Sequence, residues 1–347
     1  MSSEAGRATV REGPGRQRFA GVVLVLMWLW PSLVQAQLPD LVSVTGQYMP
    51  PAELESRPPA KAQVASYDAS LNVPVPLGRR TFLIPGLAYH FDSVSYSDTP
   101  PAFTELRAFH SLEIALLVVR LLPNDWALSL RAAPALAGDF RGFDGGLFHL
   151  SALALGTHSF STRFTLGGGL IATYAFGSLL VLPAVSAEWK PLDDLQILVF
   201  VPALVSAKYT FSRRIELGVR ADITGNSYSV RDARVADRWP CVPRVADDPA
   251  TAGNEALAAP SQCIDHVAYS VGAVGAVTGV RLFESVWWTA FAGTTFLRRL
   301  DQQNDQDAPV AGGRQALPNV FVVRTGLVWR IPIGSAATSS GHEPSAP

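Results

Sequence analysis

The chain has 347 residues and a formal net charge of -1, with 48% hydrophobic and only 16% charged residues. This length allows one large domain or two ordinary ones. Lys and Arg are neither in excess nor clustered, so the sequence lacks the basic surface that binding to nucleic-acid phosphates requires. Nucleic acid is therefore excluded from the expected partners.

Residues 1–36 are typical of a secretory signal peptide. Arg16 and Arg18 precede an apolar run that ends at Trp30, and the segment closes with Ala36. A basic flank, a short apolar stretch and small residues before a cleavage point are the parts of such a peptide, so we expect cleavage after Ala36. An uncleaved signal anchor is the alternative.

The remainder of the chain is not apolar enough for membrane-spanning helices. Its longest apolar runs are residues 114–119 and 197–207, and Pro202 interrupts the second run. A helix needs about 20 apolar residues to cross a bilayer. If the mature protein enters a membrane, it must therefore enter as β-strands.

Residues 195–231 show the clearest strand pattern. From 215 to 223 every odd position is apolar, whereas Glu216, Arg220 and Asp222 occupy even positions. Because side chains alternate across a strand, one face is wholly apolar and the other carries charges. An oily outer face and a wet inner face are typical of the wall of a membrane β-barrel.

Fourteen such segments predict an all-β fold, a transmembrane antiparallel up-and-down β-barrel with short periplasmic turns and longer external loops. The expected strands lie near residues 43–48, 65–73, 83–91, 109–121, 126–131, 147–155, 162–175, 179–189, 195–201, 205–211, 215–226, 266–282, 287–300 and 319–333. The count depends on Pro202, which cannot donate to a β-ladder and is expected to end a strand. Twelve strands is the alternative.

The connections between these segments agree with such a barrel. Short turns are expected on the periplasmic side at Gly78-Arg79, Pro123–Asp125, Gly156–Ser161, Lys190–Asp194, Ser212–Arg214 and Glu284-Ser285. The longest loops, near residues 97–105, 231–264 and 301–318, all fall on the external side, as bacterial barrels prefer. We expect residues 37–333 to form the barrel, and the small, polar residues 334–347 to be a disordered tail.

Tryptophans gather beside the expected periplasmic ends of the strands. The residues are Trp126, Trp189, Trp287, Trp288 and Trp329. Tryptophan is enriched where a membrane protein meets the lipid headgroups, so they predict an aromatic girdle. Core tryptophans of a soluble β-sandwich are the alternative, but sandwich strands are usually about 5–6 residues long.

The polar positions of the alternating segments predict the lining of the lumen. They are Asp68, Asn72, His90, Asp92, Glu113, Arg131, Glu188, Lys208, Glu216, Arg220, Asp222, Arg324 and Arg330. Charges of both signs can line an aqueous pore that selects solutes by size and charge. They can equally pair with one another and leave a closed, structural lumen.

No motif indicates catalysis, a metal site or a cofactor. The chain lacks GxSxG and HExxH, and its six histidines are scattered. His90 with Asp92, or His266 with Asp265, are conceivable parts of a hydrolase but fit polar positions of the wall better. Cys241 and Cys263 share one loop of an exported chain, which predicts a disulfide, with free thiols as the alternative.

Several segments resemble a family of bacterial outer-membrane β-barrels known only as a domain of unknown function. They are Tyr48-Met49-Pro50, LNVPVPLGRRTFLIPGLAYHF, Trp189-Lys190-Pro191 and VPALVSAKYTFSRRIELGV. The last strand also resembles the C-terminal signal read by the barrel-insertion machinery, with Ile331 in place of the aromatic residue. The resemblance implies an outer-membrane location in a Gram-negative bacterium and contacts with outer-membrane lipid.

The expected function is therefore that of a porin-like, non-enzymatic barrel that passes small solutes through a mixed-charge lumen. The alternative is a closed structural barrel whose external loops, led by residues 231–264, bind an envelope or surface partner.

Overall fold

The computed structural model describes residues 40–54, 60–97, 108–143, 145–174, 178–231, 264–304 and 309–330. The expected signal peptide, the polar tail and both cysteines lie outside these ranges, so the corresponding expectations stay predictions. Within the described ranges, no helix combines the length and the apolar character that crossing a bilayer would require.

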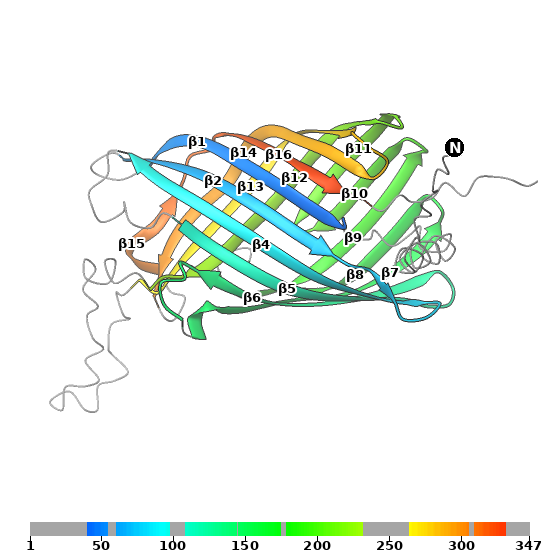
Figure 1. The fold of residues 1–347 in the computed structure, drawn as a ribbon, viewed down its shortest axis with the longest axis horizontal. Helices are drawn as coiled ribbons and strands as arrows, with labels where there is room; N and C mark the ends of the chain where they lie inside the picture. Colours follow the sequence, from blue (N-terminus) through cyan, green and yellow to red (C-terminus); the bar gives the residue numbers. More distant parts are fainter. Residues whose placement is uncertain are drawn as a thin grey trace, which may run out of the picture. The chain divides into compact units, whose positions relative to one another are not determined.

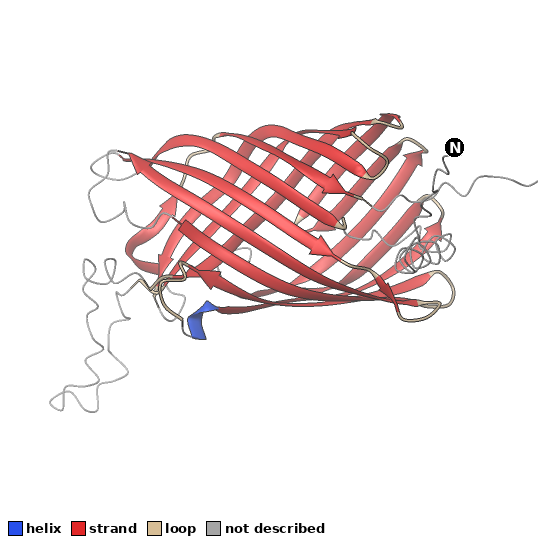
Figure 2. Ribbon diagram, viewed as in Figure 1, coloured by secondary structure: helices blue, strands red, loops and turns tan. Residues whose placement is uncertain are grey.

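Sixteen β-strands form one sheet in the described part of the chain (Figures 1 and 2). They are β1 (Val42–Leu54), β2 (Ala60–Asn72), β3 (Val75–Pro76), β4 (Thr81–Ser97), β5 (Ala108–Leu121), β6 (Trp126–Gly138), β7 (Phe148–Ser161), β8 (Phe164–Thr173), β9 (Leu180–Leu192), β10 (Leu195–Val201), β11 (Leu204–Ser212), β12 (Ile215–Ser229), β13 (His266–Arg281), β14 (Val286–Gln303), β15 (Pro309–Ala316) and β16 (Phe321–Trp329). A 3-10 helix, η2 (Gly145–Leu147), is the one helix within the described ranges.

Fourteen of these strands close into an antiparallel barrel. The ring closes where Val42 of β1 lies opposite both Leu71 of β2 and Trp329 of β16. Among the described strands, the short β3 pairs only with β4, and β15 pairs only with β14, so neither belongs to the ring. The predicted fourteen-strand barrel is thus confirmed, and the twelve-strand alternative is not.

Pro202 ends a strand as predicted. β10 stops at Val201, and the amide of Ala203 donates to the carbonyl of Phe200 at 2.8 Å. The chain then reverses so that Leu204 lies opposite Phe200. A residue without an N–H fits this tight reversal because it leaves no ladder donor unpaired.

Short turns lie at the end of the barrel that also carries Val42 and Trp329; we call it the turn end, and the opposite end the loop end. One expected turn is wrong: β7 continues through Gly156 to Ser161 and reverses at residues 162–163. Gly156 lies inside the ladder, opposite Gly168 of β8. Strand pairing therefore outweighs the flexibility of glycine at this position.

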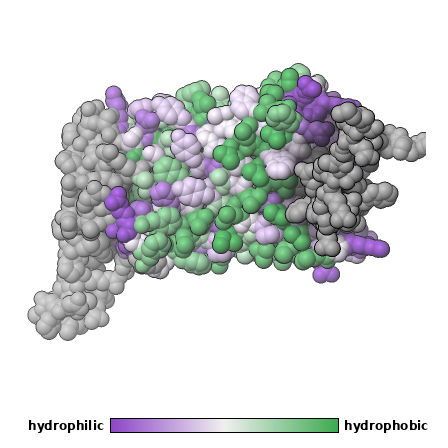
Figure 3. Space-filling model, in the orientation of Figure 1, coloured by the Kyte–Doolittle hydropathy of each residue, from purple (hydrophilic) through white to green (hydrophobic). Residues whose placement is uncertain are grey.

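The two faces of the wall differ as the alternation predicts. On β12, Leu217 and Val219 are 42% and 59% exposed on the outside, whereas Asp222 on the inside is 3% exposed. In the space-filling view, hydrophobic residues are spread over the middle of the visible face among weakly polar ones, and the most hydrophilic residues lie towards the ends (Figure 3). An exposed apolar surface of this extent is suited to contact with lipid.

The interior near the loop end is packed with apolar side chains, which we call the apolar plug. Its buried members are Met49, Ala62, Val64, Val94, Phe109, Ala137, Tyr228, Val230, Val267, Tyr269, Val271, Ala273, Phe291, Leu300, Leu317 and Val322. They come from strands all around the ring except β7–β11. β7–β11 therefore contribute no buried member to the plug.

The end of β12 crosses the interior to reach β6. Ser229 lies opposite Gly138 in a parallel pairing, and the amide of Asp139 donates to the carbonyl of Ser229 at 3.0 Å. A Cβ atom on Gly138 would stand 2.7 Å from that carbonyl oxygen and would collide with the side chain of Leu147. Glycine is therefore required here for the two strands to approach. The pairing closes a smaller ring at the loop end, from which β7–β11 are excluded.

Candidate functional site

The candidate site is the lumen, which the inward positions of the strands line. All thirteen residues predicted to line it lie on the inward face of their strands. The structure brings them together in three groups: a link across the middle of the lumen, a second link near the turn end, and a histidine cluster beneath the apolar plug. The remaining residues pair along the wall.

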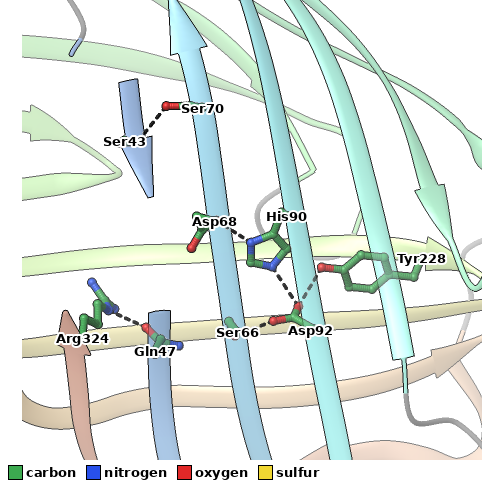
Figure 4. A network of polar contacts seen from close by, with 9 residues as sticks. All are labelled: Ser43, Gln47, Ser66, Asp68, Ser70, His90, Asp92, Tyr228 and Arg324. Carbon is green, nitrogen blue, oxygen red and sulfur yellow. Dashed lines mark hydrogen bonds and ion pairs between the residues drawn. The ribbon is translucent and has the colours of Figure 1, made fainter. Parts of the chain in front are cut away.

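The first group joins β16 to β12, although β13 and β14 lie between these strands in the ring. Nη1 of Arg324 lies 2.8 and 2.6 Å from the two carboxylate oxygens of Asp222, and Nε of Arg220 lies 2.6 Å from one of them. Arg324 also donates from Nε to Gln47 of β1 (Figure 4). Its guanidinium lies 4.8 Å from the centre of the Phe291 ring. This link narrows the lumen at mid-height.

The second group lies near the turn end. Nη1 of Arg330 is 3.0 and 3.2 Å from the carboxylate oxygens of Glu216, and its guanidinium lies 4.7 Å from the centre of the Trp287 ring. Asp40 precedes β1 here, with one carboxylate oxygen 3.7 Å from Nε of Arg330. Burial raises the pKa of the Asp40 carboxyl, and the Arg330 guanidinium opposes this effect.

The third group surrounds His90 of β4 (Figure 4). Its Nδ1 lies 2.5 Å from Asp68, and its Nε2 lies 3.1 Å from Asp92. An ionised carboxylate only accepts hydrogen bonds, so both ring nitrogens must donate, which makes the ring an imidazolium. Asp92 is 2% exposed and also accepts from Ser66 at 2.5 Å and from the hydroxyl of Tyr228 at 2.7 Å. The buried carboxylate is thus compensated by one cation and two hydroxyl donors.

Sequence reasoning missed Tyr228, which joins β12 to two strands on the other side of the interior. Besides bonding to Asp92 of β4, its ring stacks on Phe109 of β5 with centroids 5.0 Å apart. Continued alternation beyond Asp222 would have placed Tyr228 on the inward face. No pattern in the sequence indicates that it reaches across the lumen.

The other predicted lumen residues pair along the wall. Arg131 bonds to Glu113 on the neighbouring strand. Glu188 accepts from Gln196 at 2.9 Å and lies 2.8 Å from Nζ of Lys190. Lys208 faces the same lumen close enough to Glu216 to interact with its charge. Asn72 donates to the carbonyl of Asp40 at 2.9 Å.

Four of the five predicted girdle tryptophans lie on the outer surface: Trp126, Trp189, Trp288 and Trp329 are 39–50% exposed. Trp287 is a correction, because it is 9% exposed and faces the lumen between Arg281 and Arg330. Trp287 and Trp288 are consecutive residues of β14, so they must point to opposite faces.

The two histidine pairs considered for a hydrolase do not form a catalytic array. Both nitrogens of His90 are engaged by carboxylates, and Ser66 donates to Asp92 rather than to the histidine. Asp265 pairs with Arg231 at 2.7 Å instead of orienting His266. Across the described ranges, no group of three or more His, Cys, Asp or Glu residues is arranged to hold a metal ion.

The model of a family described as "Domain of unknown function (DUF6268)" matches residues 33–238, which is more than half of the 347-residue chain. The chain therefore belongs to this family. A comparison with curated proteins finds no match.

Solved structures similar to this chain include membrane channels. An outer membrane channel from Pseudomonas putida F1 is 10% identical and has a TM-score of 0.43, with 84% of this chain and 97% of that chain covered. The NanC porin is 8% identical with a TM-score of 0.34, covering 84% and 100%. A mutant of the TodX monoaromatic hydrocarbon channel is 9% identical with a TM-score of 0.36, covering 87% and 93%. Similarities at this level do not bear on activity.

Proposed function

We propose that this member of the DUF6268 family is a non-enzymatic barrel of the Gram-negative outer membrane that passes small solutes through its lumen. The observation that carries the proposal is the contrast between the two faces of one closed wall. The outside is apolar and has tryptophans at the turn end, whereas the inside carries charged groups of both signs. Such a wall suits lipid on one side and water on the other.

The paired charges suggest how the lumen would select solutes. The link from Arg324 to Asp222 crosses the lumen. We place the solute route beside β9–β11, where Lys208, Glu188 and Gln196 face inward. This lining carries charges of both signs, from Lys208 and Glu188, so neither anions nor cations are favoured strongly. Size would therefore limit passage more than net charge.

The geometry of His90 supports a non-enzymatic role. A general base needs a ring nitrogen that faces the hydroxyl it activates. In this cluster both nitrogens face carboxylates, which suits a structural cation between two buried or half-buried acids.

A second function is favoured by one observation, the apolar plug. If the plug closes every route through the barrel, the protein would be a structural barrel that captures an envelope or surface partner with its external loops. The loop 231–264 is the longest candidate, although residues 232–263 lie outside the described ranges.

Uptake by whole cells separates the two functions. A Gram-negative host would produce the protein together with a periplasmic β-lactamase, and entry would be measured for a polar β-lactam and for the apolar fluorophore N-phenylnaphthylamine. Faster entry of either probe than in cells with an empty vector supports solute passage. If neither probe enters faster although the barrel is folded in the membrane, solute passage is refuted and the structural function takes its place.

A further inference from the structure

The direct route along the barrel axis is blocked at the loop end. Met49 and Val322 in the apolar plug are 0% exposed, and Val64 is 1% exposed. Tyr228 crosses the same region with 0% exposure and bonds to Asp92 on the far wall. A solute that follows the axis would have to displace packed side chains and break this buried hydrogen bond.

Beside the plug, the wall formed by the short strands β10 and β11 ends nearer to the turn end than the wall formed by β12. β11 begins at Leu204, opposite Asp222 of β12, and the amide of Ile223 makes the last bond to this hairpin, 3.0 Å from the carbonyl of Ala203. β12 nevertheless continues to Ser229, where it meets β6. Between these two points, β12 pairs with β13 on one edge and, among the described residues, with no strand on the other.

One polar group on this free edge is satisfied locally. The amide of Ser227 donates to no strand partner among the described residues and instead donates to the side-chain oxygen of Asn226 at 2.9 Å. At Ser227, which is 2% exposed, a side chain thus takes the place of a neighbouring strand as hydrogen-bond partner.

Two aromatic rings border this interruption on the side of the loop end. His149 of β7 stacks on Tyr174, which follows β8, with ring centroids 4.2 Å apart and planes 9° apart. His149 lies beside the side chain of Asn226. It is 6% exposed, and its Nδ1 has no hydrogen-bond partner. An unpartnered polar atom on a buried ring marks a place where a further group could bind.

The Pro202-Ala203 turn borders the interruption on the side of the turn end. At about 3.4 Å per residue, the edge of β12 between Ile223 and Asn226 spans roughly 10 Å, enough for a small ring-shaped molecule. Thr224 lies within this span, on the inward face, and is exposed.

The outer surface around these strand ends is apolar. Leu150 of β7, Leu170 of β8 and Val181 of β9 are 47%, 58% and 65% exposed. The interruption therefore opens towards lipid rather than towards water, and a molecule that uses it must be soluble in lipid.

From these observations we infer a lateral portal in the wall, bounded by β12, the Pro202-Ala203 turn and the His149–Tyr174 ring pair. Small, largely apolar molecules enter the lumen from the outer leaflet through this portal and leave towards the turn end. The portal rests on the proposed solute passage and assigns to it a route and a class of solute.

Three single substitutions test the portal in the uptake assay. Thr224→Trp adds bulk within the span and is expected to lower protein-dependent entry of N-phenylnaphthylamine several-fold. His149→Ala removes one ring of the pair and is expected to raise it several-fold. His158→Ala is the matched control, because His158 lies on the same strand but packs against Trp126 at the turn end, and it should leave entry unchanged.

Met49→Ala distinguishes the axial route, since it thins the plug without touching the portal. Each variant would be compared at equal amounts of folded protein, measured as the heat-modifiable band on gels. The portal is refuted if Met49→Ala changes the rate of N-phenylnaphthylamine entry while Thr224→Trp and His149→Ala leave that rate unchanged. If only the β-lactam enters faster in the wild type, solute passage stands and the portal fails; if neither probe enters, solute passage itself fails.

Discussion

Arg324 and Asp222 form an ion pair across the lumen, although their strands are not neighbours in the ring. Their contact has two hydrogen bonds, at 2.8 and 2.6 Å, and the side chain of Asp222 is 2% exposed. A buried carboxylate is costly unless it is paired and hydrogen-bonded. The contact therefore fixes the spacing of β12 and β16 as well as the width of the lumen between them.

Arg324→Ala should destabilise the barrel. It leaves Asp222 with Arg220 alone, and loss of one partner from a buried ion pair costs roughly 3 kcal/mol. Urea unfolding of the protein in lipid vesicles, followed by tryptophan fluorescence, measures the free energy. Arg163→Ala is the control, since its pair with Asp193 is largely exposed and is expected to contribute about 0–1 kcal/mol. Equal losses in the two variants would contradict the assignment.

Tyr228→Phe tests the buried bond beneath the plug. The variant keeps the ring stacked on Phe109 but removes a donor to Asp92, so the free energy of unfolding should fall by about 1–3 kcal/mol. Tyr209→Phe, on the outer surface, should change it little. An unchanged Tyr228→Phe stability would mean that the hydroxyl does not support the carboxylate.

Gly138→Ala should separate the ends of β12 and β6. The added Cβ would collide with Leu147 and with the carbonyl of Ser229, and overpacking of this kind costs roughly 1–3 kcal/mol. Gly145→Ala is the matched control, because nothing lies within 4 Å of its added Cβ. Limited proteolysis should become faster at the loop end in Gly138→Ala only; equal cleavage of both variants would argue against the β12–β6 pairing.

Quenching by brominated lipid should distinguish two adjacent tryptophans. Trp288 lies on the outer surface and Trp287 faces the lumen. Trp288→Phe should therefore reduce the lipid-quenched part of the fluorescence, whereas Trp287→Phe should leave that part unchanged. The opposite result would mean that the inward and outward faces of β14 are reversed.

The strand number and the faces of the wall could be predicted because a period of two survives in nearly every strand. The end of a strand at Pro202 could be predicted for a local reason, because proline lacks an N–H. Gly156 was misread because a glycine looks the same in sequence whether it turns the chain or sits in a ladder. Trp287 and Trp288 both lie near a strand end, but closeness to the end does not decide which face of the strand a residue occupies; alternation does.

Contacts across the lumen could not be predicted in the same way. Alternation assigns a residue to one face of a strand but not to a position along the barrel axis, because that position depends on strand tilt and register. The Tyr228–Asp92 bond and the Ser229–Gly138 pairing both join distant parts of the sequence. Neither leaves a local pattern in the sequence.

The Ser229–Gly138 pairing also sets an order of assembly. Each neighbouring pair of strands is joined by a nearby connection or by ring closure, and hairpins form early because their contacts are local. Ser229 can find Gly138 only after β7–β12 have all been laid down and curved back towards β6. Strands β6–β12 should therefore be in place before the loop end is sealed, and the newly inserted protein passes through a stage with an open loop end that the mature fold no longer has.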